Sequence, residues 1–136
     1  MKAIVVDHHG GPEVLELREV PSPTMGDGDI LVSLEAAGVN FLDTYQRAGI
    51  YKMELPYTPG LEGAGVVEAI GANVQGISPG DTVAWCGSLG SYAEKIAVAA
   101  DKAVLVPAGV TALQAASVML QGLTAHYLTT SVFEVK

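Results

Sequence analysis

The chain has 136 residues, 49% hydrophobic and 16% charged, which fits one globular domain and is too short for a complete two-domain enzyme. Its 15 acidic and 7 basic residues give a net charge of −8, which repels phosphate backbones and argues against nucleic-acid binding. The single cysteine excludes an internal disulfide and a cysteine-based zinc site.

The amino terminus has no features of a targeting segment. It turns polar at Asp7, too early for a signal peptide. No uncharged apolar run approaches the ~20 residues that a membrane helix needs. We therefore expect a soluble, cytoplasmic domain that does not contact membranes.

The first two thirds of the chain predict β structure. Short β-branched or alternating runs, separated by Gly and Pro turns, are typical of strands. The predicted strands cover residues 3–6, 14–20, 29–37, 63–70, 82–85, 92–98 and 103–106. Many short strands followed by a terminal helix indicate a mainly β domain with a few helices, built as a barrel or a sandwich.

A short helix is predicted over residues 40–49. Asn40 is a favourable N-cap residue, and Asp43 lies in the first turn, near the positive end of the helix dipole. Gly49 follows the predicted end, as glycine commonly does.

A longer helix is predicted from about residue 112 to residue 130. Thr111 and Gln114 have the spacing of a capping box. Apolar residues then recur at helical spacing, and we expect the helix to be bent or broken near Gly122.

Common catalytic and nucleotide-binding motifs are missing from the sequence. The segment nearest to a dinucleotide fingerprint, 63–68, ends in Glu68 and runs into a predicted strand. The chain has neither a phosphate loop nor a nucleophile elbow. Surface or packing roles are expected for the three histidines, His8, His9 and His126.

Six segments, taken together and in order, are informative: 10–15, 38–51, 59–67, 79–83, 90–94 and 121–125. In this order they resemble the zinc-independent quinone oxidoreductase branch of the medium-chain dehydrogenase/reductase superfamily. The resemblance implies a GroES-like, partly open β-barrel as the catalytic domain, residues 1–110. It also implies an interdomain helix, residues 111–136, leading toward a Rossmann domain that this chain lacks, so we expect the chain to be a fragment.

The resemblance further implies hydride transfer from NADPH to a quinone without metal or flavin, the cofactor being held mainly by the Rossmann domain. The fragment alone is expected to be inactive, and the full-length protein to be a homodimer. Zinc-dependent relatives place a Cys at the position of Asn40 and a His at that of Leu61, so no zinc is expected. Two alternatives stay open: the same half of an enone or enoyl-thioester reductase, and a stand-alone GroES-like module for binding or self-assembly.

The resemblance assigns three site residues. Asn40 and Tyr51 would be catalytic and would contact the cofactor, and Thr124 would approach the nicotinamide carboxamide. Each has a simpler interpretation: a helix cap for Asn40, a half-buried packing residue for Tyr51, and a hydroxyl bonded to its own helix for Thr124. Neither Asp43 nor Glu62 is assigned as a general acid, and Cys86 is expected to be a small core residue.

Overall fold

Over residues 1–133, which the computed structural model describes, seven strands form two antiparallel sheets. In the smaller sheet, β1 (Lys2–Val5) pairs with β2 (Glu16–Glu19). The larger sheet has the order β6-β3-β4-β5-β7. Its members are β3 (Asp29–Ala37), β4 (Glu62–Ile70), β5 (Thr82–Cys86), β6 (Lys95–Ala99) and β7 (Ala103–Leu105).

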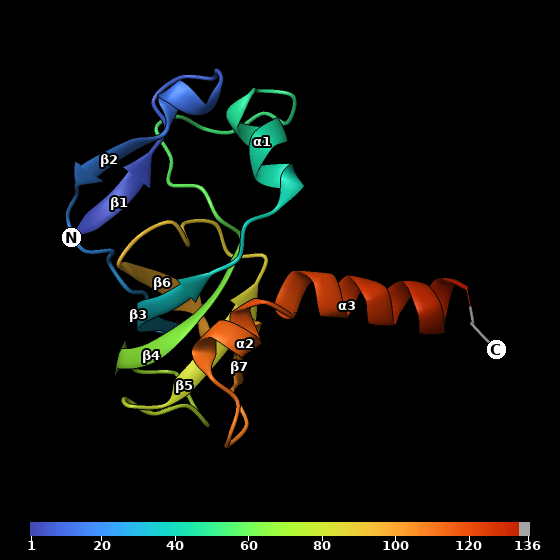
Figure 1. Cartoon of the computed structure of the whole chain (residues 1–136). Coiled ribbons are helices and arrows are strands. Elements are labelled where there is room, and N and C mark those ends of the chain that lie inside the picture. The colour runs from blue at the N-terminus through green and yellow to red at the C-terminus, as the bar shows by residue number, and fades with distance from the viewer. Residues whose placement is uncertain (134–136) are drawn as a thin grey trace.

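The two sheets meet beside β6 and curl into an incomplete barrel (Figure 1). Ala3 of β1 forms an antiparallel bridge with Ala93, and the N–H of Ile4 donates to the carbonyl of Tyr92 at 2.8 Å. Within residues 1–133, β2 pairs only with β1 and β7 only with β5, so the outer edges stay apart. The prediction of a mainly β, partly open barrel with a few helices is confirmed.

The main core lies on one face of the larger sheet and follows the two-residue period of its strands. It is aliphatic apart from one tryptophan, and its fully buried members include Ile30, Val32, Val67, Val83, Trp85 and Val98. The indole N–H of Trp85 donates to the hydroxyl of the buried Ser91 at 3.0 Å. The most polar point of this core is therefore satisfied.

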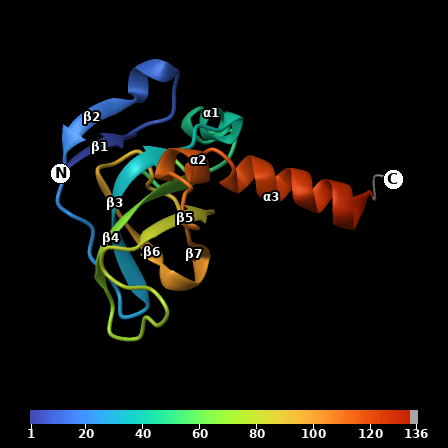
Figure 2. The same ribbon diagram turned by 60° about the horizontal axis from the view of Figure 1, so that its bottom comes forward.

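The opposite face of the sheet is covered by α2 (Ala112–Ala116) (Figure 2). Small side chains make this contact: Ala64 and Ala84 of the sheet pack against three alanines of α2, Ala112, Ala115 and Ala116. The predicted capping box starts the helix, because the N–H of Gln114 donates to the Thr111 hydroxyl at 3.2 Å. The domain boundary at residues 110 and 111 stays a prediction, although residues 112–116 share a core with the sheet.

The predicted terminal helix is interrupted, but at a different place than expected. It breaks at Ser117–Val118, and α3 (Met119–Tyr127) runs through Gly122 without a bend and continues as one wide π-type turn, Leu128–Val132. The new start has a physical cause: a carboxylate oxygen of Glu62 accepts the N–H of Leu120 at 2.6 Å. A buried acceptor thus serves one of the free N–H groups of the first turn of α3.

Two strand starts differ from the sequence predictions. The strand predicted from residue 14 begins at Glu16, because Pro12–Val14 form a 3-10 turn that buries Val14. The strand predicted from residue 92 begins at Lys95, after the segment that bridges to β1. A second 3-10 turn, Ala100–Lys102, precedes β7. Cys86, the last residue of β5, is only partly buried and belongs to none of the buried core clusters, which corrects its assignment to the core.

The helix α3 projects away from the body of the domain (Figure 1), and none of its residues is buried. Large apolar side chains along the helix and the turn that follows are more than half exposed: Leu123, Tyr127, Val132 and Phe133. Among residues 1–133, no helix has the length and apolar character needed to cross a bilayer.

Candidate functional site

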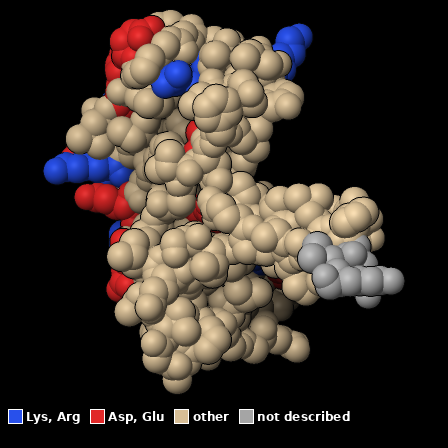
Figure 3. All heavy atoms as spheres, turned by 45° about the vertical axis from the view of Figure 1, so that its right-hand side comes forward, with Lys and Arg blue, Asp and Glu red and all other residues tan. Residues whose placement is uncertain are grey.

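The candidate site lies where the chain leaves β3, where β4 begins and where α3 begins. Asn40 stands at the start of α1 (Phe41–Arg47), Glu62 is the first residue of β4, and Gln121 lies in the first turn of α3. In Figure 3, the face around the projecting helix is mostly free of charged side chains, which lie mainly along the left and upper margins of the view, and the surface is hollowed beside the helix.

Asn40 connects α1 to this site. Its backbone is extended, with φ −122° and ψ 150°, and its N–H donates to the carboxylate of Asp43 at 2.9 Å, the acidic half of a capping box. The side-chain amide points elsewhere. Its Nδ2 donates to Oε1 of Glu62 at 2.7 Å, and its Oδ1 accepts from Nε2 of Gln121 at 2.9 Å. The amide is therefore held by groups from β4 and α3.

Glu62 is the centre of the network and is fully buried. Besides Asn40, its Oε1 accepts a hydrogen bond from Nε2 of Gln121 at 3.0 Å, while Oε2 accepts the N–H of Leu120. A buried carboxylate is tolerated only where donors replace its water, and three donors do so here. Glu62 is thus a buried, hydrogen-bonded carboxylate at the start of a strand.

A second acidic residue, Asp43, lies on the buried face of the first turn of α1. Oδ2 of the buried Asp43 accepts the hydroxyl of Tyr92 at 2.6 Å as well as the N–H of Asn40. Burial, followed by the hydrogen bond to Asp43, raises the pKa of the Tyr92 phenol well above its usual range. Tyr92 is therefore a hydrogen-bond donor at neutral pH, not an acid that releases its proton.

Two hollows flank the exposed side chain of Val39. One, of about 280 Å³, is lined by Gly38, Val39, Glu62, Leu113, Ser117 and Gln121. The other, of about 200 Å³, is lined by Leu15, Val39, Asn40, Asp43, Arg47 and Tyr92. Each is smaller than a usual pocket for a small-molecule ligand, and both are open to the surface.

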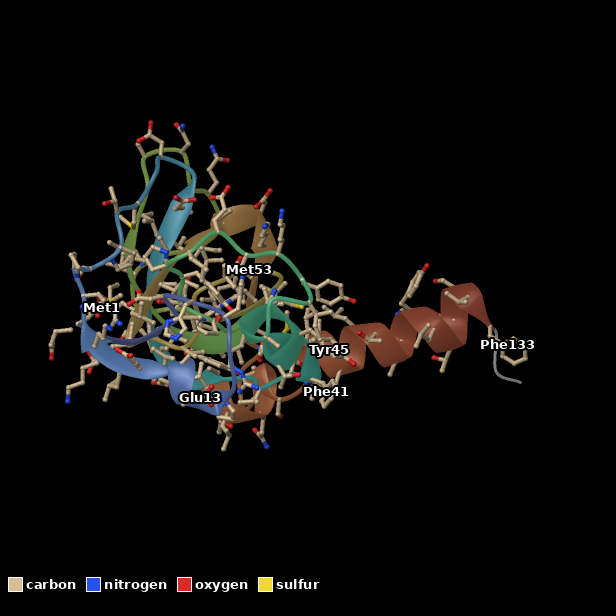
Figure 4. The ribbon with its side chains drawn as sticks, turned by 90° about the horizontal axis from the view of Figure 1, so that it is seen from above. Met1, Glu13, Phe41, Tyr45, Met53 and Phe133 are labelled. Carbon is tan, nitrogen blue, oxygen red and sulfur yellow. The ribbon has the colours of Figure 1, made fainter. Side chains whose placement is uncertain are left out.

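Tyr51, which lies beyond the end of α1, completes a short aromatic series that begins on that helix. Its ring packs edge-on against Tyr45 at 5.8 Å between centroids, and Tyr45 packs edge-on against Phe41 at 5.1 Å. Tyr51 is 52% exposed and packs against Tyr45 with part of its ring, which agrees with the simpler interpretation of a half-buried packing residue. The remainder of the ring is open to a ligand, and a catalytic or cofactor-binding role stays a prediction. Figure 4, seen from above, shows Phe41 and Tyr45 on the side of α1 toward which α3 extends.

The structure brings one of the three predicted site residues into the network, namely Asn40. Tyr51 belongs to the aromatic series, and Thr124 lies exposed on α3, one turn beyond Gln121 on the same helix face. Sequence reasoning missed Gln121 and Tyr45 as site residues. The spacing of Phe41 and Tyr45, four residues apart on a helix, was a usable signal, whereas nothing local indicates the contact of Gln121 with a residue 81 positions away.

Metal-binding side chains do not gather at the site. Across residues 1–133, no three His, Cys, Asp or Glu side chains are arranged to hold a metal ion. Cys86 lies opposite Glu62 in the β4–β5 register, and burial together with the charge of Glu62 raises the pKa of its thiol. A protonated thiol is a poor metal ligand. That the protein works without zinc or flavin stays a prediction.

Comparison with known proteins gives consistent matches over the whole chain. Residues 26–108 match the family described as the alcohol dehydrogenase GroES-like domain. The chain is 44% identical over 99% of its length to a quinone oxidoreductase of Pseudomonas aeruginosa, of which it covers 42%. It therefore spans less than half the length of that relative.

Solved structures agree with this similarity. The quinone oxidoreductase of Escherichia coli in complex with NADPH is 39% identical, with a TM-score of 0.97, over 100% of this chain and 42% of that one. A mycobacterial protein in complex with NADPH is 46% identical, with a TM-score of 0.95, over 100% of this chain and 43% of that one. The predicted GroES-like fold is confirmed.

Proposed function

The chain belongs to the alcohol dehydrogenase GroES-like domain family of the medium-chain dehydrogenase/reductase superfamily, and on that premise we propose that it is the catalytic half of an NADPH-dependent quinone reductase. The observation that carries the proposal is the Asn40 amide, which Glu62 and Gln121 hold by hydrogen bonds. Asn40 lines one surface hollow, and its two partners line the other. The two relatives solved with NADPH share the fold around these residues and support the choice of cofactor.

Bound NADPH would supply a hydride, and with one proton from water the hydride converts a quinone to a hydroquinone. The contribution of this chain would be to orient and shield the reactants. The Asn40 amide uses one of its two N–H bonds on Glu62 and one acceptor site on Gln121, so it retains a donor and an acceptor for a polar ligand. The exposed rings of Tyr45 and Tyr51 would offer edges and faces for a planar quinone.

The projecting helix α3 fits this proposal as the connection to the cofactor-binding half of the enzyme. Its apolar side chains have no cover within residues 1–133, and its first turn is fixed to the site through Glu62. We propose that residues 111–136 form the interdomain segment and that the Rossmann half packs against α3. Thr124, on the same helix face as Gln121, would then face the nicotinamide end of the cofactor.

The acceptor is tested by comparing substrates with the full-length protein. Purified enzyme is dialysed against a chelator, checked for zinc by elemental analysis, and assayed for NADPH oxidation with a benzoquinone, an enone and an enoyl thioester. The proposal expects the highest kcat/KM with the quinone and no loss of rate on metal removal. A higher kcat/KM with the enone or the thioester would instead indicate a double-bond reductase. If the enzyme oxidises NADPH with none of the three substrates, the proposal is contradicted.

A further inference from the structure

Glu62 has a property that its packing role does not require: it fixes the orientation of two side-chain amides at once. An ionised carboxylate can only accept hydrogen bonds. The Asn40 amide must therefore turn its nitrogen toward Glu62, and the Gln121 amide must do the same. Nε2 of Gln121 then also reaches Oδ1 of Asn40, which leaves neither amide free to flip without placing an oxygen against the carboxylate.

The same carboxylate joins this arrangement to α3. Its second oxygen receives the N–H of Leu120, so the start of α3 and the Asn40 amide share one rigid acceptor. Glu62 is anchored in turn at the first residue of β4, where the N–H of Gly38 donates to its backbone carbonyl at 3.1 Å. A shift of α3 relative to the sheet must therefore disturb the hydrogen bonds that orient Asn40.

We propose that Glu62 is a positioning residue of the reductase: it sets which end of the Asn40 amide faces a ligand and makes that orientation depend on the position of α3. Glu62 itself lies beneath the site, fully buried, and acts through Asn40. The inference rests on the proposed function only for its activity measurement, since the orientation of the Asn40 amide can be observed without turnover.

The test compares two substitutions in the full-length protein. Glu62→Gln keeps the shape of the side chain but replaces one carboxylate oxygen by an NH₂ group, which donates hydrogen bonds. At least one of the three groups that donate to Glu62, from Asn40, Leu120 and Gln121, then faces another donor. The side-chain amides of Asn40 and Gln121 are no longer held in one orientation and can flip. Gln121→Met keeps helix propensity at an exposed position and removes only the amide. Glu68→Gln is the matched control: it neutralises an acid of the same strand whose partner is the surface residue Lys95.

The expected results separate positioning from stability. Glu62→Gln lowers kcat with the quinone by at least about tenfold, as misplacement of a contacting group does, with a smaller change in the KM for NADPH. Gln121→Met lowers it less, and Glu68→Gln leaves it unchanged. In ¹⁵N-asparagine spectra, the Asn40 side-chain signals, identified by their loss in Asn40→Ala, shift in the first two variants and not in the control.

Two outcomes would overturn the proposal: unchanged Asn40 signals in Glu62→Gln, or a kcat that stays at the wild-type value while only the melting temperature falls. Because Glu62→Gln introduces a mismatch in a buried site, Gln121→Met provides the same comparison in a variant whose changed residue lies at the surface. If the wild-type protein oxidises no NADPH, the proposed function fails, and the Asn40 signals still decide whether Glu62 orients the amide.

Discussion

Gly38 and Glu62 lie so close that a β-carbon on Gly38 would overlap the Glu62 carboxylate. The glycine follows β3 and immediately precedes the exposed Val39, where the chain turns toward α1. The absence of a side chain at Gly38 is thus what allows a buried acid at the start of β4 to reach the Asn40 amide.

Gly38→Ala is expected to destabilise the fold by about 1–3 kcal/mol, the usual cost of inserting atoms into a packed site. Its φ is not positive, so the cost comes from the collision with Glu62 and not from the backbone conformation. Gly28→Ala is the matched control, since a β-carbon there meets nothing within 4 Å. Urea unfolding of both variants measures the difference, and equal stabilities would contradict the tight contact.

Ser91→Ala is expected to cost about 1–3 kcal/mol, because it leaves the indole N–H of Trp85 buried without an acceptor. The cost should depend on that donor. In a Trp85→Phe background, Ser91→Ala should therefore be close to neutral, and the double-mutant cycle isolates the hydrogen bond. The same loss in both backgrounds would show that Ser91 stabilises the core by some other contact.

Asn40→Ala in the full-length protein is expected to lower catalysis more than stability. The backbone N–H that Asp43 accepts is retained, but the buried Glu62 carboxylate loses one donor, so the stability loss should be about 1.5–3 kcal/mol. Activity and thermal unfolding measured on the same sample give the comparison, and proportionate losses in both would favour a purely structural role.

Asn40→Asp provides the contrasting change of similar size. It places a carboxylate against the buried carboxylate of Glu62, where Asn40 now donates at 2.7 Å. One of two adjacent carboxyls takes up a proton, so its pKa rises in the folded state. The carboxyl with the raised pKa therefore stabilises the folded variant fully at acid pH, and this stabilisation is lost as the pH rises through that pKa. We expect Asn40→Asp to gain stability relative to wild type between pH 7 and about pH 5, and a constant difference would argue against the contact.

Tyr92 predicts an alkaline limit to stability. Its raised pKa means that the folded protein keeps the phenol proton where the unfolded chain loses it. The stabilising contribution is complete below about pH 10, the ordinary pKa of tyrosine, and is lost as the pH rises further. The free energy of unfolding of wild type should therefore fall more steeply above pH 10 than that of Tyr92→Phe. Parallel curves would contradict the buried hydrogen bond to Asp43.

Sequence patterns within a few residues correctly predicted the elements whose structure depends on neighbouring residues. The strand at residues 29–37, the capping residue Asn40 and the box at Thr111 and Gln114 follow from alternation and from the pairing of side chains with nearby backbone groups. The break in the terminal helix does not, because its cause is Glu62, 58 residues from Leu120 in the chain. A glycine at position 122 was the visible signal for a break, but a buried acid elsewhere sets its position.

The candidate site divides in the same way. Asn40 could be singled out from a resemblance in sequence order, but whether its amide caps α1 or faces a ligand depends on the partners that Glu62 and Gln121 supply from other elements. The roles of Tyr51 and Thr124 toward a cofactor or substrate stay predictions.

The most direct test of the central claim is the rate of NADPH oxidation by the full-length protein with a benzoquinone, using NADPH with hydrogen or with deuterium at the transferable position of the nicotinamide. We expect turnover that needs no added metal or flavin, a slower rate with deuterium, and a much lower rate in Asn40→Ala at a temperature where that variant is folded. Absence of turnover with the intact, folded protein, or turnover that Asn40→Ala leaves unchanged, would contradict the proposed function.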